Sequence, residues 1–200
     1  MSGSDAELLD AWAAGDARAG SRLFNRYFLP ISRFFINKVP EDHDDLIQET
    51  FVACLRSRER LRDKASFRAF LFAVATNVLR MHFRRRRVHD PIEALESCSA
   101  QDLSPGPSSV LRVKEEEQAL LDALREIPLA LQIVMELYYW EDLRTHEIAN
   151  VVDLPTGTVR SHLRRGRQLL EQALAWTKLD AVGLDQRASS LRTAVTRSCA

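Results

Sequence analysis

The chain has 200 residues, of which 46% are hydrophobic and 28% charged, and its 28 Lys and Arg balance its 28 Asp and Glu. No segment reaches the roughly 18 uncharged apolar residues of a membrane-spanning helix, and residues 1–7 lack the basic and apolar parts of a secretory signal. We therefore expect no membrane insertion and a cytoplasmic location. Because the three cysteines and five histidines show no metal-ligand spacing, we also expect no metal, no cofactor and no structural disulfide.

The first forty residues show helical periodicity interrupted by turn residues. Ser4 and Glu7 form a capping-box pattern, which predicts a helix that begins there and ends at Gly15. A second helix should follow it. Pro30 and Pro40 should then bound a third, short apolar segment, because proline interrupts a helix.

Two further helices complete the first half of the chain. One should run from Asp44 to about Ser57, with these residues available to the core: Leu46, Ile47, Val52 and Leu55. The next begins at Phe67 and carries an apolar stripe made of Phe67, Phe70, Leu71, Val74, Val78 and Met81. Its end is a run of arginines, Arg84, Arg85, Arg86 and Arg87.

The composition changes after this helix. Residues 96–109 contain several helix breakers and few core residues, which predicts a flexible linker over residues 91–111. Helical pattern returns near Val110, is interrupted at Pro128, and ends in a pair of short helices that reach about Ala175. We predict an all-α protein with two small helical domains, residues 1–90 and 112–175, and a C-terminal extension over residues 176–200 that is disordered or regulatory.

Charge is sorted along the chain although the net charge is zero. Residues 41–49 hold five acidic side chains and no Lys or Arg, whereas residues 80–87 hold five arginines and no acid. This asymmetry favours a basic DNA-binding face and an acidic face for a different partner. The alternative for either run alone is a solvated helix face.

The spacing of Ala149, Asp153 and Val159 is typical of a helix-turn-helix. A small residue lets two helices cross closely, a turn residue must tolerate positive φ, and an apolar residue packs the second helix on the first. The second helix would then present polar and basic side chains suited to base edges and phosphates: Arg160, Ser161, His162, Arg164, Arg165 and Arg167. The alternative is a helical hairpin with a solvated basic face.

Several motifs along most of the chain occur together in one family. They lie at residues 15–19, 23–27, 44–51, 67–71 and 75–77, and at 124–128, 147–149 and 157–161. The most specific is the element Asp45-Leu46-x-Gln48-Glu49-x-Phe51. With these motifs the chain resembles the bacterial RNA polymerase sigma factors of the extracytoplasmic-function (ECF) group within the sigma-70 family.

This resemblance implies three sets of contact residues. Docking on the coiled coil of the polymerase β′ subunit would use Asp45, Leu46, Gln48, Glu49 and Phe51. Recognition of the minus-10 element would use a base-capturing loop and a basic helix: Arg62, Asp63, Lys64, Ala65, Ser66, Asn77, Arg80, Arg84 and Arg85. Recognition of the minus-35 element would use Thr158, Arg160, Ser161, His162, Arg164, Arg165 and Arg167.

The same resemblance implies the function and the partners. The chain would direct core RNA polymerase to bipartite promoters and help to open them, with no catalytic residues of its own. Its partners would be the β′ coiled coil and β flap of the polymerase, promoter DNA and an anti-sigma protein, and it would be a monomer when free. Gly20 and Ser21 replace an apolar pair of the family, which we expect to loosen the first core.

Three other functions are compatible with parts of the sequence. A stand-alone helix-turn-helix regulator would bind its operator without polymerase, usually as a dimer. A nuclease would hold Mg²⁺ on a carboxylate cluster formed by Asp42, Asp44, Asp45 and Glu49. An α-helical adaptor without a nucleic-acid role would leave both arginine-rich helices unexplained.

Overall fold

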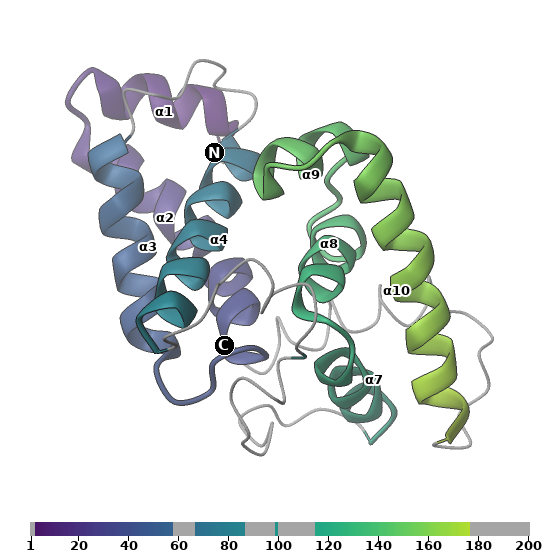
Figure 1. Ribbon diagram of the computed structural model, residues 1–200. Helices are drawn as coiled ribbons and strands as arrows, with labels where there is room; N and C mark the ends of the chain where they lie inside the picture. The colour runs from purple at the N-terminus through teal and green to yellow at the C-terminus, as the bar shows by residue number, and fades with distance from the viewer. Residues whose placement is uncertain (1–2, 58–66, 87–98, 100–114, 177–200) are drawn as a thin grey trace.

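The computed structural model describes residues 3–57, 67–86, 99 and 115–176 of the chain. Within this part it holds eight α-helices and no strand, apart from an isolated antiparallel bridge between Ser99 and Pro128 (Figure 1). The all-α prediction is confirmed. Most of the predicted linker, and the extension beyond Trp176, lie outside the described residues, and the predicted domain limits stay a prediction.

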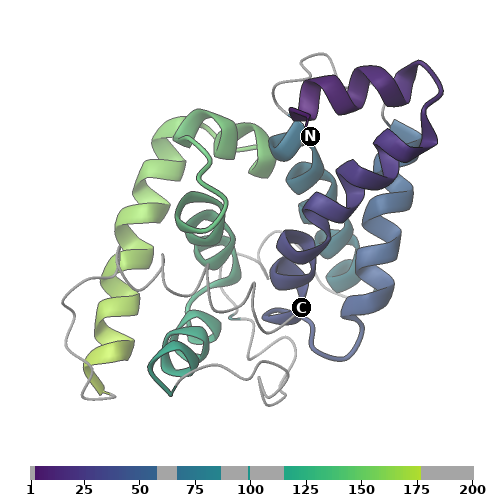
Figure 2. The ribbon, with the colours of Figure 1, turned by 180° about the vertical axis from the view of Figure 1, so that it is seen from behind.

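The described part of the N-terminal half holds four helices: α1 (Asp5–Ala13), α2 (Ala17–Ile36), α3 (His43–Ser57) and α4 (Phe67–Arg86). α1 packs across the start of α2, while α3 and α4 lie side by side and α3 packs on α2 (Figures 1 and 2). The apolar faces of all four helices meet in one core.

The start of the chain folds as its capping residues predict. The Ser4 hydroxyl accepts a hydrogen bond from the Glu7 backbone N–H at 3.3 Å, and the Ser4 N–H donates to the Glu7 carboxylate at 2.7 Å. Gly15 has a φ of +102°, which ends α1 in a conformation that glycine adopts at little cost. The Asp16 carboxylate then caps α2 by accepting from the Arg18 N–H at 2.9 Å.

The predicted break at Pro30 is wrong, because α2 continues through it to Ile36. Proline inside a helix costs roughly 3 kcal/mol. Tyr27, Ile31 and Phe34, on either side of it, are buried in the core. Since full burial of one large apolar side chain contributes about 1.5–3 kcal/mol, packing offsets the lost hydrogen bond.

The apolar stripe predicted on α4 is narrower than the surface that the helix buries. Met81 is 49% exposed, so its assignment to the core is wrong. α4 packs against α3 on one side and against α9 of the other half on another. It therefore buries residues around more than one face: Phe67, Leu71, Phe72, Ala75, Val78, Leu79 and Phe83.

Residues 115–176 of the C-terminal half also form four helices: α7 (Glu115–Glu126), α8 (Leu129–Tyr139), α9 (Thr145–Val152) and α10 (Thr156–Trp176). Only one of the last two helices is short, because α10 has 21 residues and packs on α7, α8 and α9. The two halves lie side by side, joined where α4 meets α9 (Figures 1 and 2). None of the described helices is long and apolar enough to cross a membrane.

Gly20 does not loosen the first core as expected. It is buried, and the indole ring of Trp12 lies directly over it, so that a Cβ at Gly20 would sit 2.7 Å from the Trp12 ring nitrogen. The ring also makes an edge contact with Phe24, with centroids 5.3 Å apart. Because Gly20 has no side chain, the Trp12 ring of α1 can pack directly against the backbone of α2.

We predict that Gly20→Ala lowers the free energy of unfolding by about 1–3 kcal/mol, because the added methyl group overpacks against a ring held on its other side. The measurement is urea denaturation followed by circular dichroism. Gly157→Ala is the matched control, since nothing lies within 4 Å of its Cβ position, and it should stabilise α10 by at most about 1 kcal/mol. Equal stability of the two variants would contradict the close contact.

Candidate functional site

The turn between α9 and α10 has the geometry that the sequence predicts. Asp153 adopts φ +56° and ψ +49°, the left-handed conformation, and its N–H donates to the Ala149 carbonyl. The Leu154 N–H donates to the same carbonyl at 3.1 Å. Aspartate is one of the few residues other than glycine that enter this region readily, so the turn closes without a glycine.

The packing of these two helices also follows the predicted spacing. Ala149 is buried at the crossing, and Val159 is fully buried beneath it. A feature that the sequence analysis missed is Gly166, at which a Cβ would lie only 2.4 Å from the Met135 sulfur. The glycine lets α10 approach α8 closely, which fixes the direction in which α10 leaves the turn.

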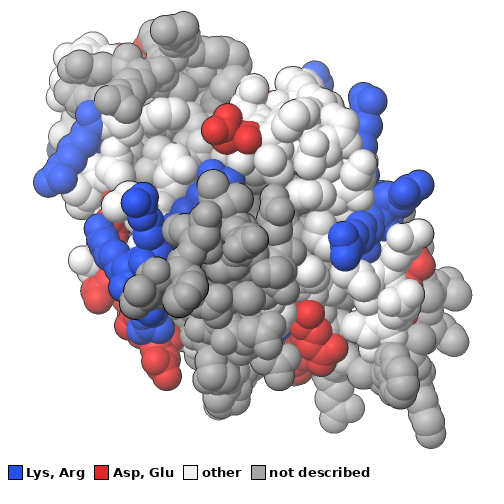
Figure 3. Space-filling model, in the orientation of Figure 1, with Lys and Arg blue, Asp and Glu red and all other residues white. Residues whose placement is uncertain are grey.

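The outward side of α10 carries most of the side chains predicted to read DNA. Five of them are exposed: Arg160, Ser161, Arg164, Arg165 and Arg167. Figure 3 shows blue side chains projecting from the α10 side of the molecule. Thr158 and His162 are half-buried. The Ser161 hydroxyl donates to the Gly157 carbonyl at 3.1 Å, so in this form it is turned toward its own helix.

Arg167 is held by a residue that the sequence analysis did not single out. Its guanidinium hydrogen-bonds the Tyr139 hydroxyl and lies 5.4 Å from the centroid of the same ring. Tyr139 is the last residue of α8, next to Tyr138, in a mostly apolar helix that also carries Gln132 and Glu136. A polar aromatic residue at the end of this helix was the available signal.

The second predicted DNA surface, at the end of α4, is partly neutralised by α3. Asn77 and Arg84 are exposed, whereas Arg85 lies 3.5 Å from the Glu49 carboxylate and Arg86 forms an ion pair with Asp42. Figure 3 shows red and blue side chains adjoining each other beside this part of the molecule. The acidic and basic runs, assigned to different partners, therefore face one another. The predicted loop Arg62 to Ser66, and Arg87, lie outside the described residues.

Arg80 differs from its neighbours because it faces the other half of the molecule. It is half-buried and donates to the Val152 carbonyl at the end of α9, at 2.6 Å. Burial lowers the pKa of Arg80, and the nearby Asp153 carboxylate partly opposes that shift. In this form Arg80 is not available to a DNA strand.

The element predicted to bind polymerase divides between the core and the surface. Leu46 is buried, and Phe51 packs against Phe24 with ring centroids 5.1 Å apart. Asp45 and Gln48 are exposed, and Glu49 is half-buried. Within this element, these three polar side chains reach the surface, and Glu49 does so beside Arg85.

Val52 and Leu55 were predicted to lie in the core, and that prediction is wrong. They are 43% and 40% exposed, respectively. With Gln48 they follow a spacing of four and three residues along α3, which places them on one face of the helix. A shallow apolar strip beside exposed polar groups is typical of a protein-binding surface.

The carboxylates that could have held Mg²⁺ do not gather. Among the described residues no group of three or more His, Cys, Asp or Glu side chains could hold a metal ion. Asp42 instead pairs with Arg86 and lies 3.9 Å from the His82 ring. Asp42 is thus engaged by side chains of α4.

Comparison with protein families identifies both halves of the chain. The family model described as Sigma-70 region 2 matches residues 31–88, and the one described as Sigma-70, region 4 matches residues 117–170. These segments contain α3 and α4 in the first half and α9 with most of α10 in the second. The surfaces described above on α3, α4 and α10 therefore lie within the two matched regions.

Curated relatives match over most of their length. The ECF RNA polymerase sigma-E factor of Haemophilus influenzae is 26% identical over 180 residues, which cover 86% of this chain and 95% of the relative. The ECF RNA polymerase sigma-E factor of Escherichia coli is 24% identical over 177 residues, covering 84% of this chain and 93% of the relative.

Solved structures show the same architecture. The sigma factor RpoE of Bartonella quintana, in complex with the anti-sigma factor NepR, aligns with a TM-score of 0.63 at 16% identity, over 80% of this chain and 98% of that one. CnrH, in complex with the cytosolic domain of CnrY, aligns with a TM-score of 0.60 at 25% identity, over 86% and 97%. Taken with the two family matches, these likenesses show that the chain belongs to the ECF group of sigma-70 factors.

Proposed function

We propose that this sigma factor, which directs core RNA polymerase to promoters, divides its contacts among three surfaces. α10 reads the minus-35 element, the arginine-rich end of α4 with Asn77 and residues 62–66 binds the minus-10 element, and α3 docks on the β′ coiled coil. The observation that carries the proposal is the exposed basic face of α10 behind a left-handed turn at Asp153.

Within α10 we assign two kinds of DNA contact. Arg160, Ser161 and Arg165 are exposed on the outward face, and we assign them to base edges in the major groove. Thr158, Arg164 and Arg167 contact phosphates, and His162, which is half-buried, contributes least. Ser161 must release its bond to the Gly157 carbonyl when it binds DNA.

For the docking surface we assign Asp45, Gln48 and Glu49 as the polar contacts, with Val52 and Leu55 as apolar additions. Leu46 and Phe51 support this surface from beneath. Acidic and amide groups complement a basic coiled coil, and an apolar strip at the centre supplies binding energy. A stand-alone regulator would have no use for this surface.

The remaining parts of the proposal follow from the family. The chain has no catalytic activity of its own, acts in the cytoplasm with the polymerase, is a monomer when free and also contacts the β flap. Because both solved relatives described above are complexes with a second protein, one of them named an anti-sigma factor, we propose that an anti-sigma protein also binds this chain.

The decisive experiment mixes the purified full chain with bacterial core RNA polymerase. We expect co-elution of the two proteins in gel filtration, and initiation from a subset of a promoter pool that core polymerase alone ignores. DNA binding without co-elution would instead support the stand-alone regulator.

The first prediction concerns α3. Replacing Val52 and Leu55 together by Glu should weaken the affinity for core polymerase by about 2 kcal/mol, roughly 30-fold, because apolar contacts at the centre of an interface dominate its energy. Affinity is measured by fluorescence anisotropy of labelled chain. Phe28→Glu is the control, because Phe28 is 50% exposed but lies on α2. Unchanged affinity of the Val52 and Leu55 variant would exclude them from the docking surface.

The second prediction concerns base recognition. Arg165→Ala should cost about 1–3 kcal/mol at the correct minus-35 element and relax the choice of base at one position. The measurement is binding of the polymerase complex to a set of single-base promoter variants. Arg22→Ala removes the same charge from an exposed position on α2 and should change neither quantity. A loss equal at all sequences would make Arg165 a phosphate contact.

The third prediction concerns Arg167 and the residue that holds it. Arg167→Ala should weaken binding to all promoter sequences alike and reduce the slope of log affinity against log salt by about one, as expected for a lost phosphate contact. Tyr139→Phe keeps the aromatic ring but removes the hydroxyl that Arg167 bonds, so its effect should be smaller and in the same direction. A sequence-dependent loss for Arg167→Ala would contradict the phosphate assignment.

A further inference from the structure

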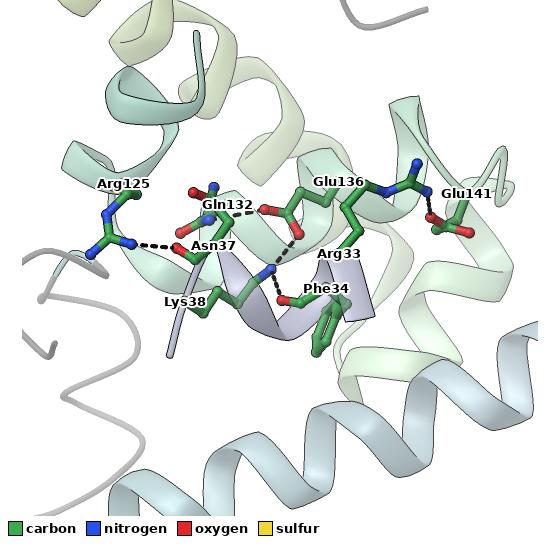
Figure 4. Close-up of polar contacts among 8 residues, drawn as sticks. All are labelled: Arg33, Phe34, Asn37, Lys38, Arg125, Gln132, Glu136 and Glu141. Atoms are coloured by element: carbon green, nitrogen blue, oxygen red, sulfur yellow. Dashed lines mark hydrogen bonds and ion pairs between the residues drawn. The ribbon is translucent and has the colours of Figure 1, made fainter. Parts of the chain in front are cut away.

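The end of α2 and the helix α8 are joined by buried ion pairs, although they belong to different halves of the chain. Figure 4 shows these contacts. The Lys38 ammonium, which is fully buried, forms an ion pair with Glu136 and donates to the Phe34 carbonyl at 2.8 Å. Arg33 forms a second buried ion pair with Glu141. We call this set of contacts the polar seam.

Three further hydrogen bonds extend the polar seam. The Gln132 amide donates to the second Glu136 oxygen at 2.9 Å. Arg125 of α7 donates to the Asn37 carbonyl at 3.1 Å, and Arg68 of α4 donates to the Glu141 carbonyl at 2.8 Å. Charged side chains of each half therefore find their ion-pair or hydrogen-bond partners in the other half.

The polar seam leaves some of its own groups unsatisfied. Three buried atoms make no hydrogen bond within the described protein: Arg33 Nε, Asn37 Nδ2 and Gln132 Oε1. Burial lowers the pKa of Lys38, and the Glu136 carboxylate opposes that shift. A buried polar group without a hydrogen-bond partner destabilises the closed form. If the two halves separated, water could bond these groups and the penalty would be removed.

Closure has different consequences for the two functional surfaces of the N-terminal half. On α4, Arg80 donates to the carbonyl of Val152, the residue directly before Asp153 in the turn of the helix-turn-helix. On α3, Gln48, Val52 and Leu55 stay exposed. The closed form can therefore meet polymerase through α3 while Arg80 is withheld from DNA.

We propose that the polar seam is a reversible latch, which keeps the two halves closed over Arg80 until a ligand that prefers the open form releases it. The role of Arg80 in this proposal rests on the proposed function, whereas the latch itself does not. A partner can shift the chain toward the open form only by the difference between its binding free energies for the open and the closed form. If the open form is a minor population, the apparent DNA affinity of the free chain falls by that fraction.

The latch is tested by the distance between the halves in the full chain. Spin labels are placed at Ser21→Cys and Gln172→Cys, both exposed, in a background with Cys98→Ser and Cys199→Ser, while buried Cys54 stays in place. Lys38→Glu sets two carboxylates against each other and should shift the distances to longer values. Combining it with Glu136→Lys restores opposite charges and should return the short distance.

Two other variants cover the case in which Lys38→Glu fails to fold. Asp153→Gly keeps a residue that favours the left-handed turn but removes the carboxylate next to Val152, whose carbonyl Arg80 bonds, and it should shift part of the population to longer distances. The combination Lys38→Met, Gln132→Leu and Glu136→Leu makes the seam apolar and should hold the short distance.

The matched control is Arg26→Glu. It makes the same change of charge at an exposed ion pair with Asp5, within the N-terminal half, and should leave the distances unchanged. If neither Lys38→Glu nor Asp153→Gly lengthens the distances, or if the charge-swapped pair stays open, the latch is wrong. None of these outcomes depends on polymerase.

The covering of Arg80 is tested by measuring how tightly the same proteins bind a short fluorescent oligothymidine in the absence of polymerase. Lys38→Glu should bind it up to about tenfold more tightly than Arg26→Glu, the gain expected if about a tenth of the free chain is open. The variant with the apolar seam should bind the oligothymidine more weakly than the natural chain does. Longer distances with equal affinities for Lys38→Glu and Arg26→Glu would overturn the gating of Arg80. Failure of polymerase to co-elute would instead count against the proposed function alone.

Discussion

Lys38 lies where the two helical halves meet, with its charge out of reach of water. A buried ammonium needs a carboxylate close by, and Glu136 supplies one from the other half of the chain. This requirement fixes how the end of α2 sits on α8, and with it the approach of α4 to α9. The relation between the two functional regions thus depends on a charged contact rather than on a shared apolar core alone.

The features that could be predicted from the sequence are local. The capping box at Ser4, the left-handed turn at Asp153 and the crossing at Ala149 each involve a few neighbouring residues whose chemistry decides the backbone. The family motifs are likewise short. They placed the candidate surfaces on α3, α4 and α10 without knowledge of the packing.

The features that could not be predicted depend on contacts between distant segments. α2 passes through Pro30 because the core holds its neighbours, and Met81 is exposed because α4 is covered from directions that periodicity cannot reveal. Val52 and Leu55 look like core residues in the sequence. Only the packing of α3 shows that they face outward, and only the packing of α4 on α9 shows that Arg80 has a partner.

Asp153 has a consequence for how such a protein diverges. Asn, Gly and Asp all suit the left-handed turn, so exchange among them preserves the shape that reads DNA. Only Asp also places a negative charge beside Arg80. Under the proposed latch, substitutions at this one position would leave promoter choice unchanged and alter how readily the two halves separate, so that the two properties can diverge independently.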